Sequence, residues 1–587
     1  MRGRVRVPRR RYQDCVPELA KMRHTAKLVY DPEIIMSKCL LAYDREEDFH
    51  VSEGKLDPIP EGLAGRVDLS DRSLHPEYPP DSPMGRVQRL LFSDCPKEFM
   101  IKNPLPVEFR SSNKEHLRHV HDLLEAAIAV KKNSKERERG FAKFFTVLKK
   151  YDDDGIAILR TIMDCVTANK NFIAPDPVNL ANLHCVLTAF AEVESMRCLD
   201  LRHWFHQLKV GDYLSSCFVI AFGSLRLKYM VLPMGWTWAP FCAQAVTTFA
   251  VAGDEALKWT EIPKMIQCGN VRAFVIYDNV LAGGPEKELD IWWEGLLSRL
   301  AKLNAVVKEG SEMKAAHGSS LDCIGLTWVP SVSGLRWCPL PRFSEKVELM
   351  DSVFKQPTCR TKQIASCLGL LQWSRYAAKM DICDMHKFYQ LLAEDVRRAG
   401  WCGTCDPSQY IGAFEKLREM SSMGFQTFTP RQDEVLAFTD AHIGGYGHVG
   451  GFPVVARSSY WPIGSSYESK DMFYLEAIAA KQTVFTFARK GRCIFLGCDN
   501  QALVFALQNK TTACPRTAVV LHELFEHLRN LDCMLIVGWI PTEHNPSDEL
   551  SRHERMSREK LLAAEQYVKW TVPPVPQFGC TLGRVVG

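Results

Sequence analysis

Two aspartates stand where the chain could hold divalent cations at the ends of short strands. Asp200 follows an apolar pair in CLDLRHWFHQLKV, and Asp278 lies in a predicted β-hairpin turn in RAFVIYDNVLAGG. Nucleotidyl transfer needs such carboxylates to bind two Mg²⁺ ions, which activate a hydroxyl group and neutralise a triphosphate. The pair therefore predicts a metal-dependent polymerase site, although either aspartate alone is more often a cap or a turn residue.

Four further acids are expected at strand ends and helix starts in the last third of the chain. They are Asp440 in LAFTDAHIGGYGHVG, Glu476 in YLEAIAAKQTV, Asp499 in CIFLGCDN and Asp548 in WIPTEHNPSDELSRH. Any one of them could be a helix cap or a surface acid. Together they predict a second Mg²⁺ site, of the kind that hydrolyses phosphodiester bonds.

The elements that must position these acids fall into separate regions. Between Gly155 and about Pro330, short apolar runs alternate with turns and helical segments, which predicts an α+β arrangement. The chain then turns mainly helical to about residue 425. From Glu434 to about Arg552 the order strand, hairpin, helix, strand, helices, strand predicts a separate α/β domain. Upstream, EHLRHVHDLLEAAIAV and FAKFFTVLKK predict two helices joined by a charged turn.

Length and composition are those of an ordinary globular protein with more than one domain. The chain has 587 residues, of which 46% are hydrophobic and 24% charged. A net charge of only +4 excludes a uniformly basic body, so any nucleic-acid groove must be local. No apolar stretch approaches 18 residues, and no membrane span is expected.

The cysteines and the arginine-rich start favour an intracellular protein. The 21 cysteines show no repeating spacing, which predicts free thiols in a reducing compartment, the cytoplasm or the nucleus. The CxxC of Cys402 and Cys405 has no second pair or histidine cluster nearby, so a loop is favoured over zinc. The opening MRGRVRVPRRRY fits a nucleic-acid arm, a targeting signal or a solvated tail equally well.

Residues 155–330 resemble retroelement reverse transcriptases. RTIMDCVTAN is similar to the fingers motif RxxxDxRxLN, except that Val166 replaces its second arginine. CLDLRHWFHQLKV resembles motif A, and YMVLPMGWTWAPFCAQ resembles LPxGxxxxPxxFQ. The resemblance implies that Asp200 and Asp278 bind metal. It also implies substrate-binding roles for Arg160 on the triphosphate, Phe205 as a gate against a ribose 2′-hydroxyl, and Gln207, Gly235 and Pro240 nearby.

The third family motif, usually YxDD, is the main departure. It aligns with Ile276 to Asn279, so that Asn279 replaces one catalytic carboxylate with a neutral amide. This variant is similar to that of VIPER/DIRS-type tyrosine-recombinase elements of trypanosomatids. Either the two remaining acids suffice for activity, or the polymerase has decayed or become structural.

The last domain resembles the ribonuclease H of the same elements, through TDA, LEAxA, DN and NPxDxLSR. The resemblance implies that its four acids bind Mg²⁺ and cleave the RNA strand of a hybrid. His544 could assist proton transfer but is favoured as a loop residue. Lys228, Arg272, Lys481 and Arg516 could line a hybrid channel, and Trp204, Trp236 and Trp238 could stack on bases, although solvation and core packing respectively are the commoner fates.

The resemblance extends to further positions and to the whole architecture. SLDCIGLTWVP is similar to a primer-grip hairpin around Ile324 and Gly325, with Lys308 or Lys314 as its lysine. We expect an α+β right-hand polymerase of fingers, palm and thumb, followed by an α/β ribonuclease H-like domain. The expected regions are an irregular N-terminal extension with a basic arm (1–110), fingers and palm (111–335), a helical thumb and connection (336–430), the nuclease (431–555) and a tail (556–587).

The sequence thus predicts an RNA-directed DNA polymerase with ribonuclease H activity. Its expected cofactor is Mg²⁺, with Mn²⁺ as a substitute, and its substrates are deoxynucleoside triphosphates. Its expected partners are an RNA template, a DNA primer and an RNA–DNA hybrid. The alternative is an element-derived protein with an inactive polymerase, which works as a nuclease only or as a nucleic-acid-binding scaffold.

Overall fold

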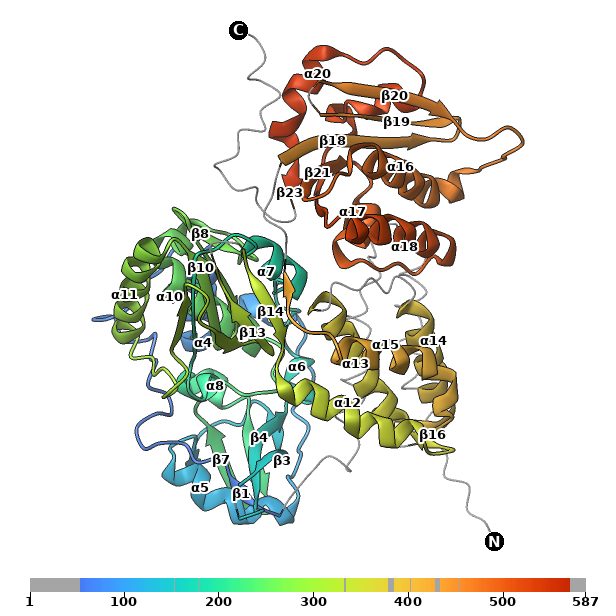
Figure 1. Ribbon diagram of the computed structural model, residues 1–587. Helices are drawn as coiled ribbons and strands as arrows, with labels where there is room; N and C mark the ends of the chain where they lie inside the picture. The colour runs from blue at the N-terminus through green and yellow to red at the C-terminus, as the bar shows by residue number, and fades with distance from the viewer. Residues whose placement is uncertain are drawn as a thin grey trace. The chain divides into compact units, whose positions relative to one another are not determined.

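The computed structural model describes residues 53–570 apart from 153, 179, 332–333, 378–384, 402, 428–432 and 452. The chain is a mixed α/β protein, and its described residues form two compact units that meet in sequence between Leu340 and Pro341 (Figure 1). The expected basic arm, Cys402 and the chain after Trp570 lie outside the described residues. Within the described ranges, no helix is both long and apolar enough to cross a bilayer.

The centre of the first unit is a five-stranded antiparallel sheet. Its strand order is β11 (Met313–Ala316), β5 (Ser195–Asp200), β10 (Asn279–Gly284), β9 (Val271–Ile276) and β8 (Ile266–Cys268). Helices α10 (Ala239–Ala252) and α11 (Glu286–Lys302) pack against each other and against this sheet (Figure 1). Tyr277 and Asp278 form a two-residue turn between β9 and β10, which confirms the predicted hairpin.

A second sheet of the first unit has six strands. Their order is β1 (Lys55–Leu56), β4 (Ala157–Asp164), β3 (Phe141–Tyr151), β6 (Val219–Phe222), β7 (Leu225–Tyr229) and β2 (Ala129–Lys131). Phe144 and Met163 from this sheet share one buried core with Leu199 and Val280 from the five-stranded sheet. The two sheets are therefore parts of one packed body.

One predicted helix is wrong. FAKFFTVLKK forms β3, which pairs along its length with β4. Its aromatic and β-branched residues suit a pleated, half-buried surface, and tertiary pairing overrides the apparent helical spacing. The upstream segment is helical only over η3 (Lys114–His119) and α5 (Val120–Glu125), before β2 begins.

The residues before 110 are less irregular than expected. Helix α4 (Pro83–Phe92) begins at an N-cap, where the Ser82 hydroxyl accepts a bond from Gly85 N at 3.0 Å. Val87 and Leu90 on α4 are buried in the main core of the unit. The expected boundary at residue 110 therefore falls inside this unit.

Shorter elements complete the first unit. Strands β12 (Leu321–Cys323), β13 (Leu326–Val329) and β14 (Arg336–Pro339) form antiparallel hairpins, the first of which turns at Ile324 and Gly325 as predicted. The remaining helices are η2 (Lys97–Phe99), α6 (Val166–Asn169), α7 (Leu183–Ala189), α8 (Trp204–Gln207), α9 (Asp212–Ser215) and η4 (Gly253–Lys258).

The second unit begins with the expected helical region. Its elements are α12 (Pro341–Phe354), α13 (Thr361–Ala377), α14 (Met385–Ala399), η5 (Pro407–Tyr410) and α15 (Ile411–Ser421), with the short strands β15 (Cys359–Arg360), β16 (Thr404–Cys405) and β17 (Gln426–Thr427). Ile364, Leu368 and Leu417 are fully buried in its core. The prediction of a mainly helical segment is confirmed.

A six-stranded mixed sheet follows. Its order is β20 (Val455–Tyr460), β19 (Gly445–Gly450), β18 (Asp433–His442), β21 (Arg492–Cys498), β22 (Met534–Trp539) and β23 (Lys569–Trp570), with β18, β21 and β22 parallel (Figure 1). Its helices are η6 (Ser469–Asp471), α16 (Met472–Phe487), α17 (Gln501–Asn509), α18 (Pro515–Asn530), η7 (Thr542–His544), α19 (Ser547–Ser551), α20 (Arg558–Ala563) and η8 (Ala564–Tyr567). The predicted element order is confirmed, and β23 extends the sheet past the expected boundary at 555.

Candidate active sites

Strand register brings the first two predicted acids together. Asp200 ends β5, and its direct partner on β10 is Asn279, the residue after Asp278. Leu201 N donates to the carbonyl of Asp278 at 2.8 Å, so the backbone segments that carry the two acids are bonded to each other. Burial, together with the charge of Asp200, raises the pKa of Asp278. Two acids held in this way are suited to bind a divalent cation, which would relieve their repulsion.

Helix α10 fixes the hairpin turn that carries Asp278. The Gln244 amide accepts a bond from Tyr277 N at 2.8 Å and donates to the carbonyl of Val275 at 2.9 Å. The Thr247 hydroxyl donates to the carbonyl of Tyr277 at 2.6 Å. Tyr277 has a φ of +56°, a strained conformation for a non-glycine residue, and these bonds hold it there.

Asn279 directs its amide toward the neighbouring acid. Its Nδ2 donates to Asp278 Oδ1 at 3.0 Å. An aspartate at this position would bring a third negative charge, whereas the amide donates a hydrogen bond. The geometry therefore gives Asn279 a means of orienting Asp278.

Lys308 forms an ion pair with the first acid. Its Nζ lies 2.8 Å from Asp200 Oδ2, and its backbone N donates to the carbonyl of Asp200 at 2.8 Å. The Ser311 hydroxyl also donates to that carbonyl, at 3.1 Å. The competing candidate, Lys314, pairs instead with Glu286 and Asp290. Sequence reasoning named Lys308, but as part of a primer grip and without its contact to Asp200.

The acids open onto a cleft of about 1330 Å³. Asp200, Asp278, Arg160, Phe205 and Lys308 all line it. The structure therefore brings two of the five predicted substrate-binding residues to the acids.

Gln207, Gly235 and Pro240 are not among the residues that line this cleft. Gln207 is fully buried, and its amide bonds the backbone of Arg202 and Val306, a position that does not fit direct substrate contact. Gly235 has a φ of +120°, and a Cβ there would lie 1.9 Å from the carbonyl oxygen of Met163. Only glycine allows this close approach of the loop to β4.

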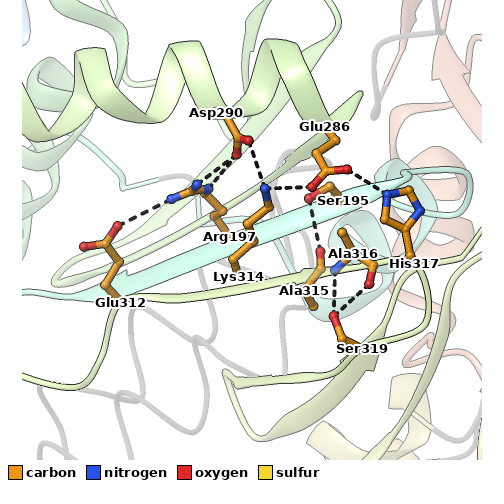
Figure 2. Close-up of polar contacts among 10 residues, drawn as sticks. All are labelled: Ser195, Arg197, Glu286, Asp290, Glu312, Lys314, Ala315, Ala316, His317 and Ser319. Carbon is orange, nitrogen blue, oxygen red and sulfur yellow. Dashed lines mark hydrogen bonds and ion pairs between the residues drawn. The ribbon is translucent and has the colours of Figure 1, made fainter.

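A network of charged side chains links β5 to its neighbour β11 and to α11. Figure 2 shows Arg197 between Glu312 and Asp290, and Lys314 between Asp290 and Glu286. Arg197 comes from β5, Lys314 from β11, and both acids that Lys314 contacts come from α11. Hydrogen bonds from Lys314 lower the pKa of Glu286 and of Asp290. The network thus ties β11 and α11 to the strand that ends in Asp200.

The four predicted nuclease acids gather at one edge of the mixed sheet. Asp440 lies on the central strand β18, and Asp499 follows the parallel strand β21. Glu476 comes from α16 and Asp548 from α19, both of which pack on β18. The carboxyl ends of parallel strands meet at the same edge, which explains why acids distant in sequence converge.

The electrostatics of these acids show how crowded they are. Burial, followed by the charge of Asp499, raises the pKa of Asp440 to about 8. Burial and the charge of Asp440 raise the pKa of Glu476, and burial raises that of Asp499. Asp548 is held by Arg552, whose Nη2 lies 2.8 Å from Oδ1. Like charges in a buried space are stable only when protonated or bound to a cation.

The donor set fits a hard cation. Glu476 Oε2 is buried and has no hydrogen-bond partner among the described residues, so an oxygen is available to a metal. Glu476, Asp499 and Cys498 present possible ligand atoms within 4.8 Å of one another. Cys498 is fully buried, and burial raises the pKa of its thiol, so we assign it to packing. Oxygen ligands alone suit Mg²⁺ or Mn²⁺.

Asn545 is a positioning residue whose role sequence reasoning missed. It is fully buried, its Nδ2 donates to the carbonyl of Thr439 at 3.1 Å, and its Oδ1 accepts from Ser547 N at 3.1 Å. It thereby joins the strand of Asp440 to the helix of Asp548. The asparagine of the NPxDxLSR motif is the sequence feature that could have indicated this role. His544 is the last residue of η7, a short 3-10 helix rather than the predicted loop, and it stacks on Tyr567 with ring centroids 3.6 Å apart.

The other predicted nucleic-acid contacts have local partners. Trp204, Trp236 and Trp238 are buried, so they are core residues, and base stacking from these positions is excluded. Lys228 pairs with Glu136 and Asp212, Lys481 with Glu523, Arg516 with Asp471, and Arg272 donates to the carbonyl of Ala189. A hybrid channel lined by these four residues stays a prediction.

Comparisons with known proteins give structural neighbours only. No family model and no curated protein matches the sequence. Solved structures that resemble the chain include three of foamy viral protease-reverse transcriptase: a dRH form with double-stranded DNA, a complex with an RNA/DNA hybrid, and a complex with double-stranded DNA. Sequence identities are 13%, 11% and 11%, and TM-scores are 0.41, 0.42 and 0.40. Each covers 92% of this chain and, respectively, 83%, 64% and 98% of the solved one.

Replacing Gln244 tests how the hairpin is held. Gln244→Met preserves the volume but leaves buried polar groups of Tyr277 and Val275 without their partner. We expect the free energy of unfolding, measured by urea denaturation, to fall by about 1–3 kcal/mol. Gln267→Met, on the exposed surface of β8, should change it by less than about 0.5 kcal/mol. Equal losses in both variants would contradict an anchoring role for Gln244.

Replacing Asp440 tests the crowding of the nuclease acids. Since its pKa is raised in the folded state, its contribution to stability is present below about pH 4 and is lost as the pH rises toward about 8. In metal-free buffer at pH 8, Asp440→Asn should therefore melt at least about 2–4 °C higher than the unaltered chain. The gain should vanish at pH 4, and Glu526→Gln on the exposed face of α18 should show none. A lower melting temperature at pH 8 would refute this electrostatic account.

Proposed function

We propose that this chain is an RNA-directed DNA polymerase joined to a ribonuclease H. The observation that carries the proposal is the pairing of Asp200 with the Asp278–Asn279 turn, in a cleft that also exposes Arg160. A second set of four acids in the other unit supports the nuclease. In this proposal the first unit supplies fingers and palm, the helical region supplies the thumb, and the mixed sheet is a ribonuclease H-like domain.

In the polymerase site, Asp200 and Asp278 would hold Mg²⁺. The bound metal would supply activation of the primer hydroxyl and neutralisation of triphosphate charge. Arg160 would bind the triphosphate, because its guanidinium group is a planar fork that matches phosphate oxygens. Phe205, which lines the same cleft, would contact the sugar of a bound nucleotide and favour deoxyribose. Asn279 would orient Asp278 without adding charge.

In the nuclease site, Asp440, Glu476, Asp499 and Asp548 would hold the metal. The metal would supply activation of the water that attacks the RNA strand. The protein's own part is to keep the four carboxylates together through the parallel strands and Asn545. The proposed partners are an RNA template, a DNA primer and their hybrid, and the proposed origin is a retroelement of the VIPER/DIRS type.

A nuclease with an inactive polymerase is the second candidate function. Asn279 favours it, because the amide removes one of the negative charges that hold cations in a polymerase site. The hydrogen bond from Asn279 to Asp278 favours the first candidate, because an amide that supports the acid preserves its geometry. The two candidates make different predictions for primer extension.

The decisive experiment measures extension of a DNA primer on RNA and cleavage of an RNA–DNA hybrid with the full chain in Mg²⁺ and Mn²⁺. Asp200→Asn should reduce extension at least about a hundredfold and leave cleavage intact, whereas Asp440→Asn should do the reverse. Glu294→Gln, an exposed acid on α11, should change neither activity.

Asn279 variants separate the candidates. If Asn279 supports a working site, the unaltered chain extends primers, and Asn279→Ala is slower than Asn279→Asp. Cleavage without extension in either metal, with extension gained in Asn279→Asp, would establish the nuclease-only protein. Absence of both activities in a folded chain would overturn the proposed function in favour of a scaffold.

A further inference from the structure

Two cysteines of the helical region lie side by side although they are far apart in sequence. Strands β15 and β16 pair antiparallel, with Cys359 directly opposite Cys405. Their Sγ atoms are 3.8 Å apart. Two bonds beside the strands reinforce the pairing. Thr361 N donates to the carbonyl of Gly403 at 2.9 Å, and the Thr361 hydroxyl donates to the same carbonyl at 3.1 Å.

This arrangement meets the geometric demands of a disulfide. Directly opposed residues of an antiparallel pair have Cα atoms about 4.5–5.5 Å apart, inside the range of about 4.4–6.8 Å that a disulfide spans. Because the two sulfur atoms are only 3.8 Å apart, rotation of the side chains can bring them to bonding distance without movement of the strands. The backbone can keep its pairing in both redox states.

A small reagent has a route to the pair. Both side chains are only 3% exposed, but Cys359 also lines a pocket of about 380 Å³. Arg360 and Lys362 line the same pocket. Their positive charge favours an anionic reagent over a neutral one.

We propose that Cys359 and Cys405 form an oxidation site, which a small anionic disulfide such as oxidised glutathione converts to an intramolecular disulfide. One cysteine thiolate attacks the reagent, forms a mixed disulfide and releases one glutathione thiolate. The second cysteine thiolate then attacks the protein sulfur of that mixed disulfide and releases the other glutathione. Two protein thiols are oxidised and one disulfide reagent is reduced to two thiols, whose sulfur atoms take up, through solvent, the two protons that the cysteines lose.

The reaction is slow and depends on pH. Burial, followed by the neighbouring Cys405, raises the pKa of Cys359 to about 12, and burial raises the pKa of Cys405. The thiolate is the attacking species, so the rate should rise by about tenfold per pH unit through the neutral range. The two cysteines therefore stay reduced during brief exposure to the oxidant and form the disulfide only when exposure is prolonged.

The disulfide would restrain one part of the helical region. It closes the segment from Cys359 to Cys405, which contains the whole of α13 and α14. Cross-linking two residues 46 positions apart removes much of the freedom of the unfolded segment. The oxidised helical region should therefore unfold at a higher temperature than the reduced one.

The test incubates the full chain with oxidised glutathione at pH 8 and maps disulfides by mass spectrometry of a non-reduced digest. We expect a peptide linked through Cys359 and Cys405, and a rise in melting temperature of about 5 °C or more that a reductant reverses. Cys405→Ala should abolish both changes and leave at most a glutathione adduct on Cys359. Cys95→Ala, at an exposed cysteine of the other unit, should abolish neither.

Three outcomes would overturn the proposal. One is a stable glutathione adduct in the unaltered chain without the intramolecular bond. Another is a bond between Cys402 and Cys405 in its place. The third is preferential cross-linking of Cys198 with Cys323, a buried pair of the first unit that also lies within hydrogen-bonding reach. Each is distinguished by the masses of the linked peptides.

Discussion

Carboxylates repel one another, and both candidate sites depend on a backbone that prevents them from moving apart. In the first unit, the register of β5 with β10 and the anchoring of the turn by Gln244 hold Asp200 and Asp278 together. In the second, parallel strands and the buried Asn545 hold four acids. The raised pKa values of Asp278, Asp440, Glu476 and Asp499 are the measure of this constraint. Protonation or a divalent cation can relieve the repulsion, and a cation does so while the carboxylates stay charged.

The two sites differ in how many polar partners the protein supplies to their negatively charged carboxylates. Lys308 pairs with Asp200, and Asn279 donates to Asp278, so each acid of the first site has a polar partner. In the second site, Glu476 has an oxygen with no partner among the described residues. The second site therefore has the greater need for a cation. The first is nearer to balance without one, because Asn279 contributes a neutral amide and no further negative charge.

The order of elements and the acids were predictable from sequence because they lie in local patterns. Apolar runs ending in Asp440 and Asp499 specified strands, and the two-residue spacing around Asp278 specified a hairpin. FAKFFTVLKK was predicted as a helix, since its apolar residues fit both helical and strand periodicity and only pairing with β4 decides between them. The contact of Lys308 with Asp200 and the joining role of Asn545 could not be predicted, because they depend on loops that meet only after folding.

The tight turn of the β9–β10 hairpin limits how this segment can change in length. Side chains alternate between the two faces of a strand, so one inserted or deleted residue turns every following side chain to the opposite face. With only Tyr277 and Asp278 in the turn, no loop can absorb such a change. The loop between β2 and β3, residues 132–140, is longer and can absorb such a change. Insertions should therefore accumulate there, whereas the segment from Val271 to Gly284 can vary in sequence but not in length.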